Sequence, residues 1–138
     1  MPLLAVVQLR PTPHDPAGNR ARTVAAIERA AAAGAALVVL PELATTGYAF
    51  PSREALTAEA EPLDGPAVAA WSAAAARHGI AIVAGLAERA AEGCYNTAVA
   101  IGPAGVAGVY RKAHLFAEER ALFRPGNTGP VVVELRGI

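Results

Sequence analysis

Short apolar, β-branched runs flank an amphipathic stretch at the start of the chain. Residues 3–9 (LLAVVQL) and 36–40 (ALVVL) are predicted to be buried strands, each ended by proline. Between them, apolar residues recur at helical spacing from Asn19, a residue type suited to an N-cap, to Gly34. Because strand, helix and strand follow one another, we expect a right-handed βαβ unit and a parallel core.

The rest of the chain continues with helix, strand and hairpin patterns. Residues 64–78 carry apolar positions on one helical face and end before Gly79, and residues 80–86 (IAIVAGL) form a third predicted strand. Residues 95–101 and 106–110 flank a Gly-Pro-Ala-Gly turn, which predicts an antiparallel hairpin. The predicted sheet is therefore mixed.

Three weaker signals complete the predicted elements. They are a short helix over 52–60, one helical turn over 118–123 and a strand over 131–135. No internal repeat, linker or low-complexity segment divides the chain. We therefore expect an α/β fold and a single domain over residues 1–138.

The composition narrows the kind of partner. With 12 Lys and Arg against 12 Asp and Glu, the formal net charge is zero. The chain therefore has no excess of positive charge that would attract nucleic acid or an acidic membrane surface. Apolar stretches stop short of the roughly 18 residues that a membrane span requires, and no signal peptide is recognisable. The single cysteine, Cys94, cannot form an internal disulfide. We expect a cytoplasmic protein with a small-molecule partner, and neither nucleic acid nor membrane as a partner.

Two charged residues stand where open α/β sheets place their active sites, just past the carboxyl ends of strands. Glu42 follows the second predicted strand, and Lys112, the only lysine among the 12 basic residues, follows the hairpin. The chain has no glycine-rich dinucleotide turn, no phosphate loop and no paired histidines spaced for zinc. We therefore expect no cofactor and no metal, so the carboxylate and the amine are the candidate chemical groups.

Both candidates have a functional and a structural interpretation. Glu42 is either a solvated loop residue or a desolvated one, and desolvation would raise its pKa toward that of a general base. Lys112 is either a surface charge or an ammonium that stabilises a developing oxyanion. Their residue types and positions leave both interpretations open.

Four short sequence motifs, and the order in which they follow one another along the chain, give further information about the protein class. They are residues 40–43 (LPEL) with 46–48 (TGY), 95–98 (YNTA) with 101–103 (IGP), 110–112 (YRK) with 114–116 (HLF), and 123–126 (FRPG). Together they resemble the nitrilase-like carbon-nitrogen hydrolases over almost the whole length of the chain. The resemblance implies an αββα sandwich with a mixed sheet, and it favours active-site roles for both Glu42 and Lys112.

The resemblance also implies a mechanism, in which a cysteine attacks an amide or nitrile carbon. Glu42 would then be the general base, and Lys112 would stabilise the tetrahedral intermediate. The family's second glutamate, which supports the lysine and positions substrate, matches Glu119, with Glu118 as the alternative. Whether the substrate is a nitrile, a simple amide, an N-carbamoyl compound or an acyl-transfer acceptor stays open. The family commonly dimerises, so a homo-oligomer is expected.

Aromatic residues gather beside both candidate groups in the sequence. They are Tyr48, Phe50, Tyr110 and Phe116. These side chains either wall a substrate pocket or fill the core beneath loops. Tyr48 and Phe116, together with His114, are the candidate substrate-binding residues.

The nucleophile is where the sequence departs from the family pattern. The family places its cysteine after the lysine, at the end of the strand expected near Val131, and residues 131–138 contain none. Cys94 precedes the hairpin, so we expect it to be a small apolar residue. The sequence is thus expected to be a truncated, amino-terminal half of a hydrolase, inactive by itself.

Two other hypotheses assign the chain to a class of protein other than the hydrolases. A non-catalytic remnant that binds a partner or dimerises through its sheet would explain the missing cysteine. A generic flavodoxin-like binding domain fits the chain length but not the antiparallel hairpin.

Overall fold

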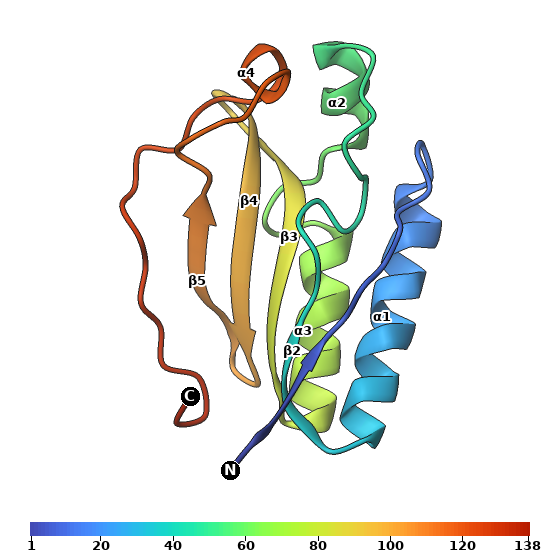
Figure 1. The fold of residues 1–138 in the computed structure, drawn as a ribbon, viewed down its shortest axis with the longest axis vertical. Helices are drawn as coiled ribbons and strands as arrows, with labels where there is room; N and C mark the ends of the chain where they lie inside the picture. Colours follow the sequence, from blue (N-terminus) through green and yellow to red (C-terminus); the bar gives the residue numbers. More distant parts are fainter.

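A five-stranded mixed sheet organises the chain in the computed structural model, which describes residues 1–138 (Figure 1). The strands are β1 (Leu3–Val6), β2 (Ala35–Val39), β3 (Ala81–Ala90), β4 (Gly93–Gly102) and β5 (Gly105–Arg111), and they lie in that order. The pairs β1–β2 and β2–β3 are parallel, whereas β3–β4 and β4–β5 are antiparallel. The predicted α/β class, parallel core and hairpin are confirmed.

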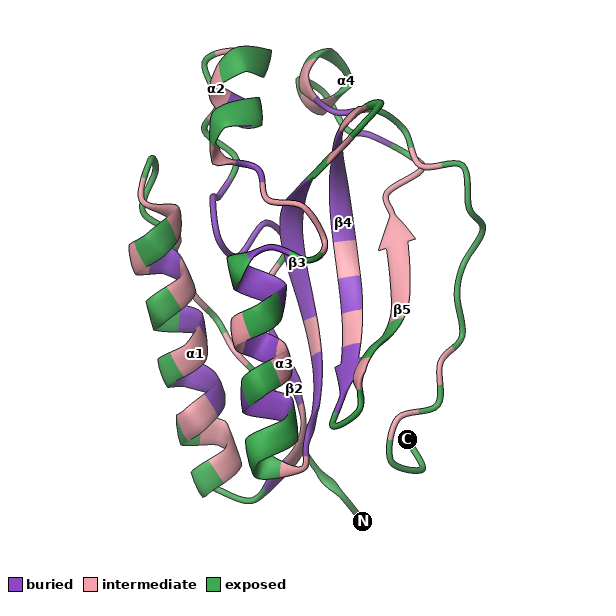
Figure 2. Cartoon of the chain, turned by 180° about the vertical axis from the view of Figure 1, so that it is seen from behind, coloured by how far each residue is buried: buried purple, intermediate pink, exposed green.

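Helices cover one face of the sheet and one of its ends. The helices are α1 (Pro16–Ala32), α2 (Arg53–Glu59), α3 (Pro66–His78) and α4 (Glu119–Leu122). Figures 1 and 2 show α1 and α3 side by side on one face, with α2 and α4 at the end where β5 finishes. None of the four helices combines the length and apolar character needed to cross a bilayer. One sheet and one helical layer are present, which is half of an αββα sandwich.

The main core lies between the sheet and the pair α1 and α3. Trp71 is fully buried there with Ile27 and Val99. The Trp71 indole donates a 2.8 Å hydrogen bond to the Thr23 hydroxyl of α1, so the one polar atom of the ring is satisfied. This contact links α3 to α1. The opposite face of the sheet carries no helix (Figures 1 and 2).

A second, smaller cluster holds α2 and α4 against the end of the sheet. It contains Leu43, Leu56 and Phe123, with Phe50 packed against it. The Phe50 and Phe123 rings meet edge to face with centroids 6.2 Å apart. Phe50 is therefore a packing residue rather than a pocket wall.

The start of α1 differs from the prediction. Asp15, not Asn19, is the N-cap, because its carboxylate accepts a 2.9 Å hydrogen bond from the backbone N–H of Gly18. Asn19 lies inside the helix and is buried. Its amide donates to the carbonyls of Thr12 and Thr45, both at 2.8 Å, and so ties the loops after β1 and β2 to α1.

Two predicted strands are corrected by the structure. The first strand, predicted over 3–9, is shorter, and it is mostly exposed rather than buried because β1 is the sheet edge; only Ala5 of this strand packs against the main core. The segment 131–135 forms no strand. It runs beside β5 (Figure 1), where Val131 and Val133 lie against Gly108 without joining the sheet.

Candidate functional site

The loop after β2 carries Glu42 to the end of the sheet where the parallel strands finish. A Cβ at Gly85 of β3 would lie 2.6 Å from the Cα of Glu42, so the loop packs directly on the bare backbone of this glycine. The N–H of Gly85 donates to the Pro41 carbonyl at 3.2 Å, and its carbonyl accepts from Ala44 at 2.9 Å. Leu43 is fully buried at a φ of 47°, a left-handed conformation that its packing maintains.

Lys112 is held at the end of β5 by two backbone contacts. Its N–H donates to the Asn96 carbonyl at 2.8 Å, and its carbonyl accepts from Gly126 at 2.9 Å. A Cβ at Gly126 would lie 2.1 Å from the Arg111 carbonyl oxygen, so only glycine fits there. The Pro-Gly segment therefore fixes the lysine backbone from the side opposite β4.

Glu119 begins the four-residue helix α4 and folds back on its own turn. Its backbone N–H donates to the Phe116 carbonyl at 3.0 Å, and its carboxylate accepts from the Phe116 N–H at 2.8 Å. This reciprocal pair resembles a capping box and orients the carboxylate toward Lys112. The neighbouring Glu118 is exposed and makes no side-chain capping bond.

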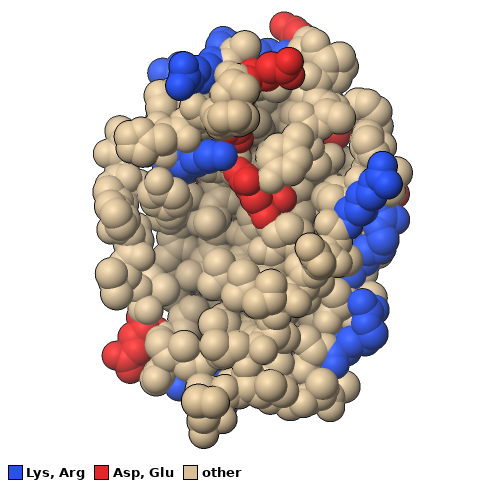
Figure 3. Space-filling model, viewed as in Figure 1, with Lys and Arg blue, Asp and Glu red and all other residues tan.

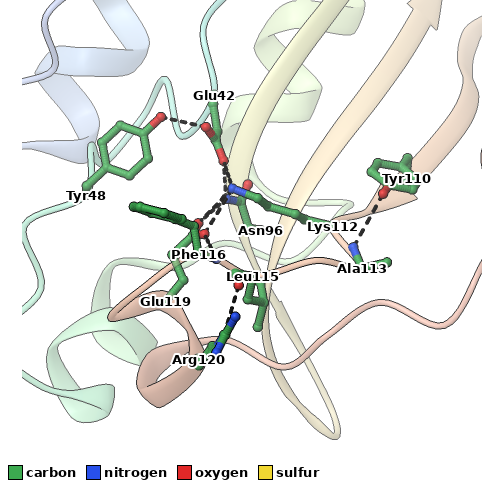
Figure 4. Close-up of polar contacts among 10 residues, drawn as sticks. All are labelled: Glu42, Tyr48, Asn96, Tyr110, Lys112, Ala113, Leu115, Phe116, Glu119 and Arg120. Carbon is green, nitrogen blue, oxygen red and sulfur yellow. Dashed lines mark hydrogen bonds and ion pairs between the residues drawn. The ribbon is translucent and has the colours of Figure 1, made fainter.

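These three residues, distant in sequence, meet in one cluster (Figure 4). The Lys112 ammonium lies 2.8 Å from Glu42 Oε1, 3.0 Å from Glu119 Oε2 and 3.3 Å from Glu119 Oε1. Their side chains are partly shielded, with 29% of Lys112, 40% of Glu42 and 12% of Glu119 exposed. Charge-assisted hydrogen bonds of this kind are stronger than neutral ones. One ammonium thus bridges two carboxylates.

Asn96 of β4 completes the cluster, although the sequence did not single it out as a site residue. Its side-chain nitrogen donates to Glu42 Oε1 at 2.5 Å and to Glu119 Oε1 at 2.8 Å. Only the NH₂ end of the amide can face two carboxylates, because its oxygen has no proton to donate. Asn96 is 4% exposed, so the amide is held in place. Its position in the segment 95–98 was the only signal available.

Hydrogen bonds set the ionisation of the cluster. Burial acts to raise the pKa of Glu42, but bonds from Lys112, Tyr48 and Asn96 and the charge of Lys112 hold it below its usual range. For Glu119, burial is likewise outweighed, and the bond from the Phe116 N–H is the largest cause that lowers its pKa. Of the two interpretations that the sequence left open, neither describes Glu42 fully: the residue is partly desolvated, but its hydrogen bonds outweigh the effect of burial on its pKa.

The pKa values of the two remaining ionisable groups, Lys112 and Tyr48, are raised rather than lowered. Burial acts to lower the pKa of Lys112, yet its bonds to Glu42 and Glu119 raise it overall. Burial and the 2.7 Å hydrogen bond that Tyr48 donates to Glu42 Oε2 raise the pKa of Tyr48 to about 12. At neutral pH the cluster therefore holds two carboxylates, one ammonium and a neutral phenol.

A cavity of about 350 Å³ opens between Glu42 and Lys112. Its other lining residues are uncharged and include Leu40, Val83 and Tyr110. On the face of the molecule opposite α1 and α3, acidic and basic side chains meet over a hollow, and the centre of the face below it is uncharged (Figure 3). Glu42 and Lys112 are therefore the only charged residues that a small molecule would meet in this cavity.

The other candidate residues lie in different surroundings. Tyr48 and Phe116 are 60% and 78% exposed, and Figure 4 shows both beside the cluster. His114 lines a separate pocket with Arg120, so the structure does not bring it to the Glu42 cavity. Cys94 is buried, and its sulfur lies 3.7 Å from the Thr57 hydroxyl. No group of three or more His, Cys, Asp or Glu side chains is arranged to hold a metal ion.

The structure thus places a lysine between two glutamates at one end of the sheet of an α/β layer, and sequence comparison identifies the family. The carbon-nitrogen hydrolase family model matches residues 3–138, so the chain belongs to the carbon-nitrogen hydrolase family. It is 41% identical to a nitrilase from Pyrococcus abyssi over 96% of this chain and 51% of that protein. It is 36% identical to an (R)-stereoselective amidase from a Pseudomonas species over 90% of this chain and 44% of that protein.

Solved structures agree with this assignment. A CN-hydrolase superfamily protein from Xanthomonas campestris superimposes with a TM-score of 0.82 and 35% identity, covering 96% of this chain and 49% of that one. An amidase from Nesterenkonia superimposes with a TM-score of 0.75 and 30% identity, covering 95% and 50%. The chain spans about half the length of the relatives it matches.

Proposed function

We propose that the chain supplies the acid–base half of an active site that hydrolyses non-peptide carbon–nitrogen bonds in amides, nitriles or N-carbamoyl compounds. The observation that supports this most strongly is the Lys112 ammonium held 2.8 Å from Glu42 and 3.0 Å from Glu119. An ionised carboxylate beside a fixed cation provides both a proton acceptor and an oxyanion partner. Membership of the carbon-nitrogen hydrolase family supports the reaction type.

The proposed roles follow from the charges in the cluster. Glu42 takes the proton of an attacking thiol, whose sulfur forms a bond to the amide carbon while the carbonyl π electrons move to oxygen. Lys112 stabilises that oxyanion. Collapse of the tetrahedral intermediate expels the nitrogen, which leaves as ammonia or an amine with the proton from Glu42. Glu42 then deprotonates a water molecule, whose oxygen attacks the thioester carbon. Collapse of this second tetrahedral intermediate breaks the carbon–sulfur bond, the thiolate takes the proton back from Glu42, and the acid is released.

Glu119 and Asn96 keep this arrangement in place. Glu119 holds Lys112 from the side opposite Glu42 and is itself fixed by the Phe116 N–H. Asn96 binds both carboxylates, which would otherwise repel each other across the ammonium. Their proposed role is to position Glu42 and Lys112.

The thiol in this mechanism is not Cys94. Cys94 lines a small cavity with Thr57 and Arg124, which is not the cavity of Glu42 and Lys112. A nucleophile from outside these 138 residues agrees with relatives that are about twice as long. The proposal is therefore that the complete active site combines this chain's Glu42 and Lys112 with a cysteine from a second segment.

The uncharged lining of the cavity supports a small neutral substrate. Apart from Glu42 and Lys112, the lining side chains carry no charge. A charged substituent placed over Leu40 and Val83 would lose hydration without gaining a partner. Short aliphatic amides and nitriles are therefore the first compounds to test.

The test is ammonia release by the protein purified from its natural source, with its intact mass measured on the same sample. A mass near twice 14.0 kDa together with turnover of a short amide or nitrile is expected. Glu42→Gln should lower turnover about 100- to 10,000-fold, the usual contribution of a general base. Glu118→Gln changes an exposed neighbour of Glu119 and is the matched control.

Three outcomes would contradict the proposal. Wild-type turnover retained in Glu42→Gln would remove the assigned base. Ammonia release by the 138-residue chain that survives Cys94→Ala would show that no external thiol is needed. A native mass of 14.0 kDa without turnover would favour the non-catalytic binding module.

A further inference from the structure

A second polar network lies on the opposite face of the same strands, and the mechanism above does not use it. Its centre is Glu88 of β3, which is 2% exposed although it is a carboxylate. Arg111 donates to Glu88 through Nε at 2.9 Å and through a terminal nitrogen at 2.5 Å, a two-point contact. The Thr97 hydroxyl of β4 donates to the same carboxylate at 2.6 Å.

This network joins three strands at the end where the active-site cluster lies. Glu88 belongs to β3, Thr97 to β4 and Arg111 to β5. Thr97 and Arg111 are paired across the antiparallel ladder. The edge strand β5 is therefore fastened across β4 to β3 at its last residue.

The two networks are connected through adjacent residues. Successive side chains along a strand point to opposite faces. Asn96 and Thr97 are neighbours on β4, and one contacts Glu42 while the other contacts Glu88. Arg111 and Lys112 are neighbours in the same way. Fixing the Arg111 side chain thus fixes the backbone from which Lys112 reaches its two glutamates.

The geometry of Arg111 suits a rigid anchor. Its guanidinium lies 3.9 Å above the centre of the Tyr95 ring, a cation–π contact that restrains the plane of the group. A planar guanidinium that donates two hydrogen bonds to one carboxylate is fixed in orientation, whereas an ammonium in its place would not be. The lone lysine of the chain, by contrast, is bonded around one nitrogen.

We propose that Glu88 and Arg111 are positioning residues, whose two-point contact fixes the end of β5 and thereby holds the Lys112 ammonium between Glu42 and Glu119. The inference rests on the proposed function, because the position of Lys112 matters to catalysis only if the cluster is the active site. This role gives a reason for the burial of the Glu88 carboxylate, which binds the last residue of β5, the strand that precedes Lys112.

The substitution Arg111→Gln separates positioning from simple electrostatics. Removing a positive charge next to Lys112 would, by itself, raise the Lys112 pKa, because a like charge disfavours the ammonium. Loss of position instead takes Lys112 away from Glu42 and Glu119 and lowers its pKa.

The experiment is an NMR titration of the 138-residue chain grown with ¹³C,¹⁵N-lysine, which reports on Lys112 alone because it is the only lysine. Arg111→Gln is expected to shift the Lys112 pKa down from its wild-type value. The matched control is Arg89→Gln, since Arg89 adjoins Glu88 on β3 but is exposed and contacts Thr57 instead. The control should leave the Lys112 pKa unchanged.

A second variant covers the case in which Arg111→Gln does not fold. In Glu88→Gln/Arg111→Gln no buried charge lacks a partner, and the Lys112 pKa is again expected to fall. A Lys112 pKa that is unchanged or raised in either folded variant would overturn the positioning role. A wild-type Lys112 pKa at or below its ordinary value would instead contradict the active-site cluster, and so the proposed function itself.

Discussion

Gly85→Ala is the most informative single substitution, because it acts on Glu42 without touching any charged group. The added methyl would lie 2.6 Å from the Glu42 Cα, 2.8 Å from the Leu43 nitrogen and 2.9 Å from the Pro41 carbonyl oxygen. All three atoms are backbone, so no side-chain rotation relieves the overlap. The loop that carries Glu42 must move away from β3.

The size of the movement follows from ordinary contact distances. Non-bonded carbon atoms sit about 3.5 to 4.0 Å apart, so the Glu42 Cα must retreat by about 1 Å. The Lys112–Glu42 hydrogen bond, now 2.8 Å, would then exceed hydrogen-bonding length. Overpacking of this kind costs about 1 to 3 kcal/mol of folding free energy. For the proposed hydrolase, a misplacement of about 1 Å would lower turnover about 100-fold.

Two measurements on the 138-residue chain test this expectation. Urea denaturation gives the change in unfolding free energy, and the lysine-labelled NMR titration gives the Lys112 pKa, which should fall. Gly129→Ala is the control, because no atom lies within 4 Å of a Cβ there and its backbone is not left-handed. A Gly85→Ala chain with wild-type stability and an unchanged Lys112 pKa would refute the packing of the Glu42 loop on β3.

Three further predictions concern the carboxylates and Tyr48. Asn96→Leu removes the shared donor, so the pKa values of Glu42 and Glu119 should both rise in carboxyl ¹³C titrations; unchanged values would contradict the bridging role. Because folding lowers both pKa values, the stabilisation is complete above the unfolded glutamate pKa of about 4.3 and is lost as the pH falls through the lower folded values. In Glu42→Gln/Glu119→Gln, the unfolding free energy should therefore fall less steeply as the pH is lowered than it does in the wild-type chain. An equally steep fall would contradict the lowered glutamate pKa values. In Tyr48→Phe, the phenol titrating at about 12 should disappear from the ultraviolet pH titration, whereas persistence of that step would assign it to another tyrosine.

Most of the fold could be predicted from local patterns. Helices and strands with clear periodicity, such as those ending at Gly79 and flanking the 102–105 turn, were located to within a few residues. The exposure of β1 and the absence of a strand at 131–135 were not predicted. An apolar, β-branched run in the sequence does not show which other segments pack on it or pair with it. The Asp15 cap was missed since Asp15 and Asn19 both have suitable side chains, and Pro16 at the first helical position decides between them.

Position at a strand end made Glu42 and Lys112 candidates, and the family resemblance added Glu119. The structure brings these three residues together, whereas polar residues inside strands were not singled out. Asn96 and Glu88 lie within β4 and β3, and their partners are known only once the register pairs these strands. The direction of the Glu42 pKa shift could not be predicted from the sequence, because the three donors that surround the carboxylate come from distant positions in the chain. The catalytic roles, the homo-oligomer and the cytoplasmic location stay predictions.

The most direct test of the central claim, that one ammonium is held between two ionised glutamates, is the titration of wild-type Lys112 by lysine-selective NMR. The account predicts a Lys112 pKa above the ordinary value of about 10.4, falling in both Glu42→Gln and Glu119→Gln. A pKa at or below that value, insensitive to either substitution, would mean that the three side chains do not form one site in solution.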